Sequence, residues 1–472
     1  MSSRSLSPIV PVGTTQNAAA LALADAVILG HEQARVPRYT SYPTAPHFGD
    51  GVDETAYRGW LADLSPGASL SIYLHVPFCR SMCWFCGCHT RATRHDTPVI
   101  AYAADLRAEM DLLLPLLSAP GPVRHVHWGG GTPNILEPQT FVDIMAHLRD
   151  RLRFAPDAEI AVELDPRTVT PQMIEAMAQA GVTRVSLGIQ SFEPQVQQAI
   201  NRVQSYGLAA RLAQDLRKAG ILCLNLDLMY GLPGQDVANV AQSTRQALDL
   251  APDRLSVFGY AHLPRLKRHQ RMIDESALPG AAARLAQCRA ISDVLTQADY
   301  TPIGLDHFAR GHDPLSRALQ EGRLRRNFQG YTTDPADILL PLGASAIGAF
   351  PQGYAQNIAD VALWHDAVRA GRLPIKRGKA LSSEDRLRRA VIEHLMCFLW
   401  VDLAAIAAAH DTGPSVFTDS LERLRPLQDQ GAVIRQAWRL TVPEAFRPLI
   451  RSIACAFDTY LHPEEDRHAR AV

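Results

Sequence analysis

Between Leu70 and about Phe350, short apolar strands alternate regularly with helical stretches, and this alternation constrains the fold most. Such a pattern is typical of parallel βα units. It predicts an α/β fold with a mainly parallel sheet. We expect strands at 70–78, 125–130, 159–166, 184–191, 224–231 and 254–263, a weaker strand at 300–308, and helices between them, for example at 138–152 and 236–250.

One face of most of these strands is apolar, whereas the other carries charged and amide side chains such as Glu163, Gln190 and Asp227. Parallel sheets are usually covered on both faces, and a closed eight-stranded barrel fills its interior with apolar side chains. Burying unpaired charges would cost free energy. The pattern therefore predicts a complete or partial barrel with an open polar lumen. The alternative is a sheet with one exposed face, which is rare for parallel strands.

The composition excludes several classes of protein. With 47 basic and 48 acidic residues the net charge is −1, which gives no overall attraction to nucleic acid or anionic membranes. No apolar run approaches the roughly 20 residues that span a bilayer, and Asp25 interrupts the apolar stretch at 18–29 that a signal peptide would need. We expect a cytoplasmic monomer without nucleic-acid partners or a membrane span.

The chain of 472 residues is long enough for a large barrel with appendages. We expect an N-terminal extension over 1–65, a barrel over 66–375 and a mainly helical, winged-helix-like domain over 376–472. The extension begins with about 15 residues that look disordered, followed by a helix to His31. Ser382 to Asp385 resembles a capping box, and a β-ribbon is expected after Gly431. We favour a structural cap over a DNA-reading module, because no basic recognition helix is evident.

Four of the eight cysteines lie within ten residues, as Cys79-x3-Cys83-x2-Cys86-x-Cys88, at the end of the first strand. Barrel enzymes carry their chemistry at this end of the strands. A structural zinc site uses two separated ligand pairs, and no second pair has suitable spacing. Three clustered thiolates suit three irons of a cubane cluster and leave the fourth iron open to another ligand.

The CxxxCxxC motif within YLHVPFCRSMCWFCGC resembles the radical S-adenosylmethionine (SAM) superfamily. The further Cys88, together with RYTSYPTA (38–45), HWGGGTP (127–133), ELDPR (163–167) and NLDLMYGLPGQ (225–235), resembles the oxygen-independent coproporphyrinogen III oxidases of haem biosynthesis. The resemblance implies a partial (β/α)6-type radical SAM barrel with an N-terminal extension and a mainly helical C-terminal domain.

The resemblance also implies an activity. An oxidoreductase of this kind converts two propionates of coproporphyrinogen III to vinyl groups through 5′-deoxyadenosyl radicals from SAM, giving protoporphyrinogen IX. The electron donor is unidentified. Two alternatives stay open on the same scaffold: a haem-binding or haem-delivery protein, and a radical SAM methyltransferase that opens haem.

The resemblance assigns roles to individual residues. It implies one [4Fe–4S] cluster held by Cys79, Cys83 and Cys86, two SAM molecules, and catalytic roles for Cys88 and Tyr73. Cys88 has the alternative of a small buried residue in a tight turn. Arg38 and Tyr39 are the candidate substrate contacts. The expected SAM contacts are Tyr73, Phe85, Gly130, Gly131, Thr132, Glu163, Gln190, Arg202, Asp227, Ala261 and Ile347.

Overall fold

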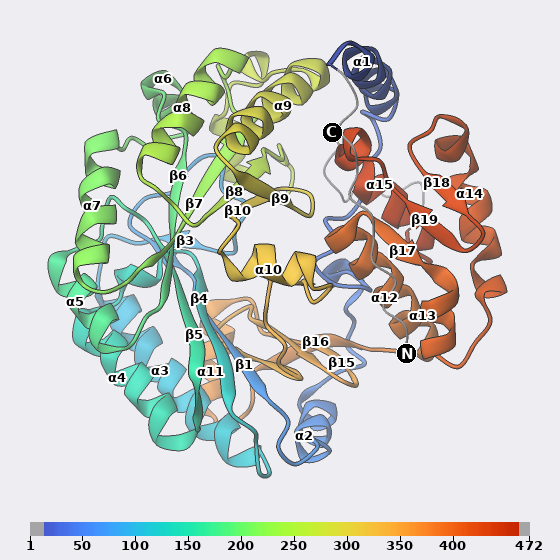
Figure 1. Ribbon diagram of the computed structural model, residues 1–472. Helices are drawn as coiled ribbons and strands as arrows, with labels where there is room; N and C mark the ends of the chain where they lie inside the picture. The colour runs from blue at the N-terminus through green and yellow to red at the C-terminus, as the bar shows by residue number, and fades with distance from the viewer. Residues whose placement is uncertain (1–13, 462–472) are drawn as a thin grey trace.

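A computed structural model describes residues 14–461, and these form a central sheet of 12 strands in the order β16-β15-β14-β13-β1-β4-β5-β6-β7-β8-β10-β9 (Figure 1). The expected disorder of the first 15 residues falls almost wholly outside the described residues. The helix expected up to His31 is α1 (Thr14–Gly30).

Six consecutive strands of this sheet are parallel, and each corresponds to a strand expected from the alternating sequence pattern. They are β1 (Leu70–Val76), β4 (Val123–Gly130), β5 (Phe154–Leu164), β6 (Arg184–Gln190), β7 (Cys223–Tyr230) and β8 (Arg254–Gly259). The expected α/β class and partial six-stranded parallel barrel are confirmed.

The sheet continues beyond the parallel strands at both edges, where sequence reasoning was incomplete. The single strand expected at 300–308 is an antiparallel pair on the far side of β8. At the other edge β13 pairs with β1 in parallel, and three antiparallel strands follow it, none of which was expected. These edge strands are β9 (Tyr300–Ile303), β10 (His307–Arg310), β13 (Ile338–Leu342), β14 (Ile347–Phe350), β15 (Gly353–Asn357) and β16 (Ile375–Ala380).

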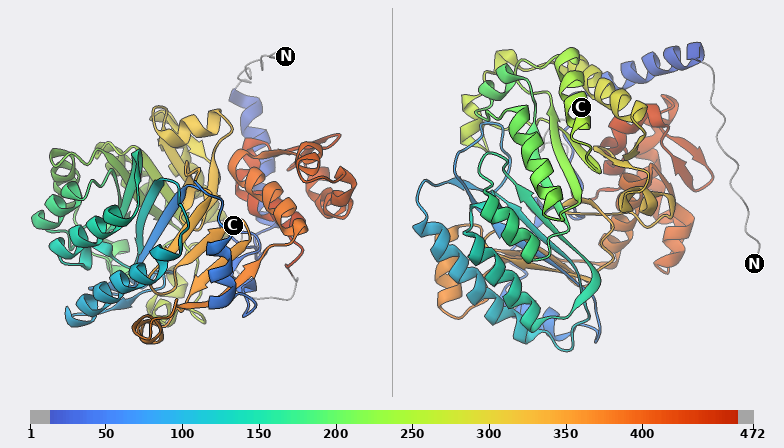
Figure 2. Two further views of the ribbon diagram at one scale, coloured as in Figure 1. Left: turned by 90° about the horizontal axis from the view of Figure 1, so that it is seen from below. Right: turned by 60° about the vertical axis from the view of Figure 1, so that its left-hand side comes forward.

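Helices cover the outer side of the parallel strands (Figures 1 and 2). Their apolar side chains pack on the apolar strand face, where Leu70, Ile72 and Leu74 of β1 are fully buried. The helices are α3 (Thr97–Leu113), α4 (Pro138–Arg151), α5 (Pro171–Gln179), α6 (Pro194–Ala199), α7 (Tyr206–Lys218), α8 (Val237–Asp249) and α9 (Ala281–Gln297). The expected helices at 138–152 and 236–250 are therefore present as α4 and α8.

The inner strand face is polar, and ion pairs occupy it at the amino ends of the strands. Arg184, the first residue of β6, donates to Glu159 at 3.0 Å. Arg254, the first residue of β8, donates to Asp313 at 2.8 Å. Because each charge has an opposite partner, the buried polar face is tolerated. These ion pairs thus occupy the inner face at the amino ends of the strands.

The C-terminal residues form a second core that faces the sheet from the side away from α4, α5 and α7 (Figure 1). Ser382 caps α12 (Ser383–Phe398) in a capping box with Asp385, as expected. The expected β-ribbon is β18 (Ile434–Gln436) and β19 (Arg439–Thr441), which β17 (Trp400–Asp402) extends to three strands. Three more helices complete this region: α13 (Leu403–Ala409), α14 (Thr418–Asp429) and α15 (Ile450–Ala454).

Part of the N-terminal extension joins this second core, through Ala24, Ile28, Tyr39 and Tyr42, whereas Tyr57 and Leu61 belong to the barrel core. The boundary expected at 376 falls within β16, the edge strand of the large sheet. No helix within residues 14–461 is long and apolar enough to cross a membrane.

Candidate functional site

A polar cavity of roughly 690 Å³ lies at the carboxyl ends of the parallel strands, between the cysteine loop and the inner strand face. Strand register explains its composition, because Glu163 of β5 lies beside Ser186 of β6, and Gly188 of β6 lies beside Asp227 of β7. The expected SAM contacts that line it are Phe85, Gly130, Gly131, Thr132, Glu163, Gln190, Arg202 and Asp227, together with all four clustered cysteines.

Hydrogen-bond donors surround the sulfurs of the three expected cluster ligands. Cys79 Sγ accepts from Thr132 Oγ1 at 3.2 Å and lies 3.3 Å from Thr90 Oγ1. The buried Cys83 sulfur accepts from Arg202 Nη1 at 3.3 Å and from Arg167 Nη2 at 3.4 Å. Such donors stabilise negative charge on sulfur, which is the form that binds a metal.

The remaining two clustered cysteines, Cys86 and Cys88, interact with each other through hydrogen bonds. The backbone N–H of Cys88 donates to Cys86 Sγ at 3.4 Å. The hydrogen bond from the Cys88 side chain lowers the pKa of Cys86 to about 6, despite the opposing effect of burial. Cys88 itself is exposed. The alternative of a small buried turn residue is therefore wrong for Cys88, whereas its catalytic role stays a prediction.

The glycine triplet 129–131, at the end of β4, brings backbone close to the site. Gly130 has φ +106°, and a Cβ there would lie 2.5 Å from the His75 ring. A Cβ on Gly131 would lie 2.4 Å from Thr90 Oγ1, and one on Gly129 would lie 3.0 Å from Glu163. Only glycine fits at positions 130 and 131, where the backbone itself forms the wall of the cavity.

Two carboxylates on the inner strand face differ in protonation. Burial opposes ionisation of Glu163, but hydrogen bonds from His127 Nε2 at 3.0 Å and from the Gly130 N–H at 3.3 Å hold its pKa below the ordinary value. Burial and the nearby Glu163 charge raise the pKa of Asp227 to about 6. The pair thus offers an ionised acceptor and a carboxyl group that titrates near neutrality.

A bulge in β6 directs Gln190 into this cavity. The pairing with β7 shifts between Gly188 and Gln190, and Gln190 adopts φ +67°, an uncommon conformation for a residue other than glycine. The buried Arg202 donates to the Gly188 carbonyl at 2.6 Å and lies 3.5 Å from Asp165. Arg202 therefore holds the bulge and Cys83 in one network.

Sequence reasoning missed a segment whose side chains form hydrogen bonds with the backbone of the cysteine loop. Three side chains of one stretch after β8 donate to carbonyls of that loop: Lys267 to Cys88 at 2.9 Å, His269 to Cys86 at 2.7 Å and Gln270 to Phe85 at 3.0 Å. A basic run, RLKRHQR, is the only signal, and its proximity to the cysteines depends on the closure of the sheet. Other missed residues of the site are His127, Asp165 and Arg167.

Three expected SAM contacts do not line this cavity. Tyr73 donates to Nδ1 of His75 at 3.0 Å and stacks on His127. His75 in turn donates through Nε2 to the His89 carbonyl at 2.9 Å, and burial lowers the pKa of His75 to about 4, so this imidazole is neutral. Ala261 follows β8, and Ile347 begins β14. Their assignment as SAM contacts stays a prediction.

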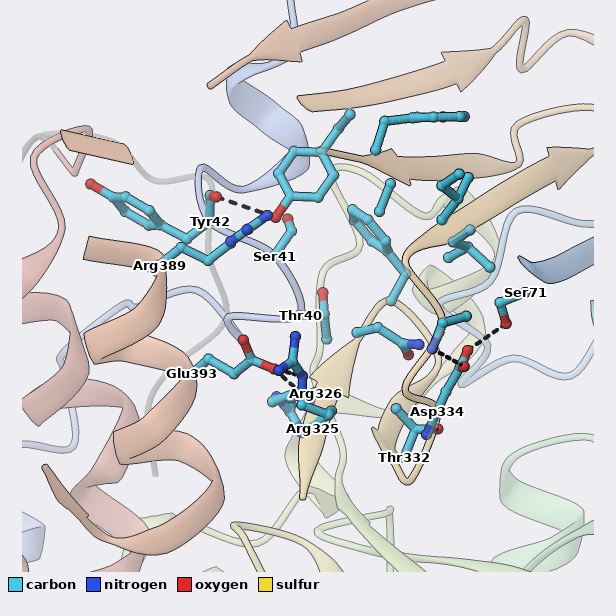
Figure 3. Close-up of a pocket in the computed structure, with 18 of the residues that line it drawn as sticks. Thr40, Ser41, Tyr42, Ser71, Arg325, Arg326, Thr332, Asp334, Arg389 and Glu393 are labelled. Atoms are coloured by element: carbon cyan, nitrogen blue, oxygen red, sulfur yellow. Dashed lines mark hydrogen bonds and ion pairs between the residues drawn. The ribbon is translucent and has the colours of Figure 1, made fainter. Parts of the chain in front are cut away.

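A second, larger cavity of roughly 960 Å³ lies between the N-terminal segment, the start of β1 and α12 (Figure 3). Tyr39, Thr40, Ser41 and Tyr42 form one wall, whereas Arg38 is not in the lining. Arg38 instead donates to the Gly259 carbonyl at 3.2 Å, and Tyr39 donates to Asp458 at 3.0 Å. Other polar lining side chains come from distant segments: Ser71, Arg325, Arg326, Asp334, Arg389 and Glu393.

The residues present fit an iron–sulfur cluster with a bound cosubstrate. Three thiols share one loop with donors to each sulfur, and the glycine wall and the two carboxylates face the same cavity. In residues 14–461, no three His, Cys, Asp or Glu side chains converge on a single-ion site. A cubane requires no such convergence, since each thiolate binds a different iron.

Comparisons with known proteins agree with this arrangement. Residues 73–247 match the radical SAM superfamily. The chain is 50% identical over 447 residues to the oxygen-independent coproporphyrinogen III oxidase of Bradyrhizobium diazoefficiens, covering 95% of this chain and 99% of that protein. It is 39% identical over 429 residues to the Escherichia coli enzyme of the same name, covering 90% and 93% of the two chains. The solved structure of the coproporphyrinogen III oxidase from E. coli, a radical SAM enzyme, superposes with a TM-score of 0.86 at 37% identity, covering 91% of this chain and all of that one.

Proposed function

The chain belongs to the oxygen-independent coproporphyrinogen III oxidases, radical SAM enzymes of haem biosynthesis, and we propose that it converts two propionates of coproporphyrinogen III to vinyl groups, giving protoporphyrinogen IX. The observation that carries this proposal is that the three thiols, each with a hydrogen-bond donor, line the same cavity as two carboxylates and the glycine backbone. This is the arrangement needed to hold a cluster and a charged cosubstrate side by side.

Cys79, Cys83 and Cys86 would hold a [4Fe–4S] cluster, with Thr132, Arg167 and Arg202 stabilising the thiolate charge. When bound, the cluster and SAM supply the 5′-deoxyadenosyl radical chemistry that removes a hydrogen atom from an unactivated carbon. No acid–base group of a protein can remove such a hydrogen, so the cofactors carry this step.

The chain's own residues position SAM and exclude water. We assign Glu163 and Asp227 to the hydroxyl and ammonium groups of SAM, because carboxylates accept strong hydrogen bonds from such donors. Gly130 and Gly131 allow close approach of the methionyl part. Arg202 keeps Gln190 and Cys83 fixed, so that the reacting groups are held in one geometry.

We propose two SAM molecules, since not all of the expected contacts line one cavity. Eight of them line the 690 Å³ cavity, whereas Tyr73, Ala261 and Ile347 lie outside its lining. Equilibrium binding of SAM to cluster-loaded protein should approach two per chain. A value of one in the presence of substrate would contradict this assignment.

The larger cavity is the proposed substrate site. Hydroxyl groups and arginines from several segments line it. Arginine pairs well with propionate carboxylates. Within the segment RYTSYPTA, Tyr39 and the three residues after it line this cavity, so that the segment forms a wall of the proposed site. A direct contact of Arg38 with substrate stays a prediction.

All eight cysteines carry free thiols in the structure, which suits the reducing cytoplasm where we place the enzyme. The expectation of a monomer stays a prediction, which sedimentation would test.

An anaerobic assay tests the proposed function. Cluster-loaded protein, dithionite, SAM and coproporphyrinogen III should yield protoporphyrinogen IX and 5′-deoxyadenosine. Cys79→Ala should abolish both products, because a cluster ligand is lost. Cys223→Ala is the matched control, since this thiol is the first residue of β7, at the opposite end of the strand from the cavity, and should keep activity. Tight haem binding without either product would instead favour a haem-delivery protein.

A further inference from the structure

Three polar side chains of α3 are buried on the face of this helix that packs against the sheet. Tyr102, Asp105 and Glu109 are at most 4% exposed, and their spacing of three and four residues places them on one side of the helix. Asp105 pairs with α11 (Val361–Arg369), which packs beside α3 (Figure 1). Tyr102 and Glu109 instead form hydrogen bonds with the turn between β13 and β14. A helix that covers a sheet is usually apolar on this face, so these buried polar groups require a specific partner.

The turn at 343–346 joins the carboxyl end of β13 to β14 and contains two residues in the left-handed region. Gly343 has φ +93°, and Ser345 has φ +67°. For a residue other than glycine this conformation is strained, and it persists only where the surrounding structure fixes it. The shape of the 343–346 turn therefore depends on contacts with its neighbours.

Glu109 and Tyr102 supply such contacts. Glu109 Oε2 accepts from the Gly343 N–H at 2.7 Å, and Glu109 Oε1 accepts from Asn357 Nδ2 at 2.6 Å. The same Asn357 amide donates to the Gly343 carbonyl at 2.8 Å. The Tyr102 hydroxyl accepts from the Ala344 N–H at 2.9 Å. Because these partners of Glu109 are uncharged, and a carboxyl group is costly to bury without a counter-charge, the bonds to Gly343 and Asn357 are what offsets the cost.

The 343–346 turn lies beside the functional site. The Tyr102 hydroxyl donates to the His75 carbonyl at 2.7 Å, and the His75 ring lies against the glycine backbone of the cavity wall. The segment after β15 makes a second contact, because His89 of the cysteine loop donates through Nε2 to the Ala359 carbonyl at 2.7 Å. Ile347, one of the expected SAM contacts, follows the turn directly. A displaced turn would therefore move groups that belong to the site.

We propose that Glu109 is a positioning residue for SAM, which acts through the 343–346 turn and keeps Ile347 in place. The inference rests on the proposed function, which assigns two SAM molecules because contacts such as Ile347 lie outside the lining of the 690 Å³ cavity. Glu109 acts on binding alone, since its bonds reach the turn and Asn357 and not the reacting groups. The expected effect is therefore on SAM affinity and not on the chemical step.

The test uses Glu109→Gln in the full-length, cluster-loaded protein. Both carboxylate oxygens of Glu109 accept from N–H groups, and glutamine replaces one oxygen with a donor, so that one contact is lost at unchanged side-chain size. Asp253→Asn is the matched control, because Asp253 accepts from the Leu224 N–H at 2.8 Å at the amino ends of β7 and β8, away from the cavity. Tyr102→Phe removes the neighbouring contact to the turn. We measure SAM binding by equilibrium dialysis, urea unfolding, and KM for SAM together with kcat.

Wild-type protein should bind two SAM molecules, and Glu109→Gln should weaken one of them at least tenfold while the other keeps its affinity. Tyr102→Phe should act in the same direction. KM for SAM should rise, whereas kcat at saturating SAM should stay within about twofold of wild type, because only binding is lost. Adding Asn357→Ala to Glu109→Gln should change the affinity by less than the product of the two single effects, since the two side chains share a contact. Asp253→Asn should lower the urea midpoint and leave SAM affinity unchanged.

Unchanged affinity for both SAM molecules in Glu109→Gln would overturn the positioning proposal. An equal loss of affinity in Asp253→Asn would do so too, because any loss of stability would then weaken SAM binding. A fall in kcat at unchanged SAM affinity would also contradict it, since Glu109 would then act on the chemical step. Binding of a single SAM by the wild type would instead contradict the assignment of two SAM molecules, so the two failures are distinguishable.

Discussion

At the scale of single residues, the two lumen carboxylates act as an unequal pair. Glu163 is stabilised as an anion by His127 and the Gly130 N–H, and its charge then disfavours ionisation of Asp227. Like charges in a partly buried site push two pKa values apart. A cationic ligand such as the sulfonium and ammonium groups of SAM would relieve this repulsion, so the apoprotein carries an electrostatic cost that ligand binding removes.

We predict that Asp227→Asn changes the pH dependence of apoprotein stability. The raised pKa of about 6 means that, between about pH 4 and pH 6, the folded state binds more protons than the unfolded state. The free energy of unfolding should therefore fall as pH rises through this window, by roughly 1–3 kcal/mol. Asp227→Asn should remove that part of the fall, as urea unfolding at pH 4.5 and 7.5 would measure.

Asp215→Asn is the control for this prediction, because Asp215 is 54% exposed and paired with Lys218 on a helix surface. It should leave the pH dependence unchanged. If Asp227→Asn kept the full wild-type fall in stability, the raised pKa of Asp227 would be wrong.

Site residues could be predicted from sequence where the alternation of side chains along a strand is enough to place them on the lumen face. Glu163, Gln190 and Asp227 were expected on the lumen face, and all three line the cavity. Arg167 and His127 were missed as site residues because their roles depend on partners far along the chain, Cys83 and Glu163. No local pattern contains such a pair.

At the scale of elements, the end of β4 and the bulge in β6 place backbone at positions that ordinary strands do not reach. Gly130, the last residue of β4, has φ +106° and lies against the His75 ring. The sequence shows three glycines there, and their role could be expected. The bulge at Gly188 to Gln190 could not be foreseen, because a shift in register is a property of two strands together.

The edge strands were missed for a similar reason. The segment ILLPL at 338–342 is short, and Pro341 argues against a central strand. In the structure Pro341 lies beside Tyr73 in a parallel pair. Pairing with β1, 268 residues earlier in the chain, therefore decides its conformation, and local propensity does not.

We predict that Gly130→Ala destabilises the protein by about 2–4 kcal/mol and weakens SAM binding at least tenfold. The new methyl group would lie 2.5 Å from the His75 ring, in addition to the strain of the left-handed backbone. Gly220→Ala separates the two causes, since Gly220 has φ +88° and no atom within 4 Å of its Cβ position. It should cost only about 1 kcal/mol. Equal losses in urea unfolding would show that His75 is not the obstacle.

At the scale of the whole molecule, the N-terminal segment connects the barrel to the C-terminal core. Tyr39 donates to Asp458 and Tyr42 contacts Thr459, while Arg326 of the β11 strand (Arg325–Asn327) donates to the carbonyls of Arg38 and Tyr39. The wall of the larger cavity is thus fixed by residues that lie more than 280 positions away. The position of this wall could not be predicted from sequence, although its motif was recognisable.

This connection predicts a separation of substrate binding from SAM binding. Asp458→Ala removes the acceptor of the buried Tyr39 hydroxyl. This loss should destabilise the position of the N-terminal segment against the C-terminal core by about 1.5–3 kcal/mol. Since that segment lines only the larger cavity, KM for coproporphyrinogen III should rise roughly tenfold, whereas the Kd of SAM should not change. Tyr39→Phe should change KM in the same direction, and adding it to Asp458→Ala should have little further effect, because the bond between the two side chains is then already broken. Asp419→Ala, at an exposed position in the first turn of α14, should have no effect. Parallel loss of SAM affinity in Asp458→Ala would mean that the two cavities behave as one site.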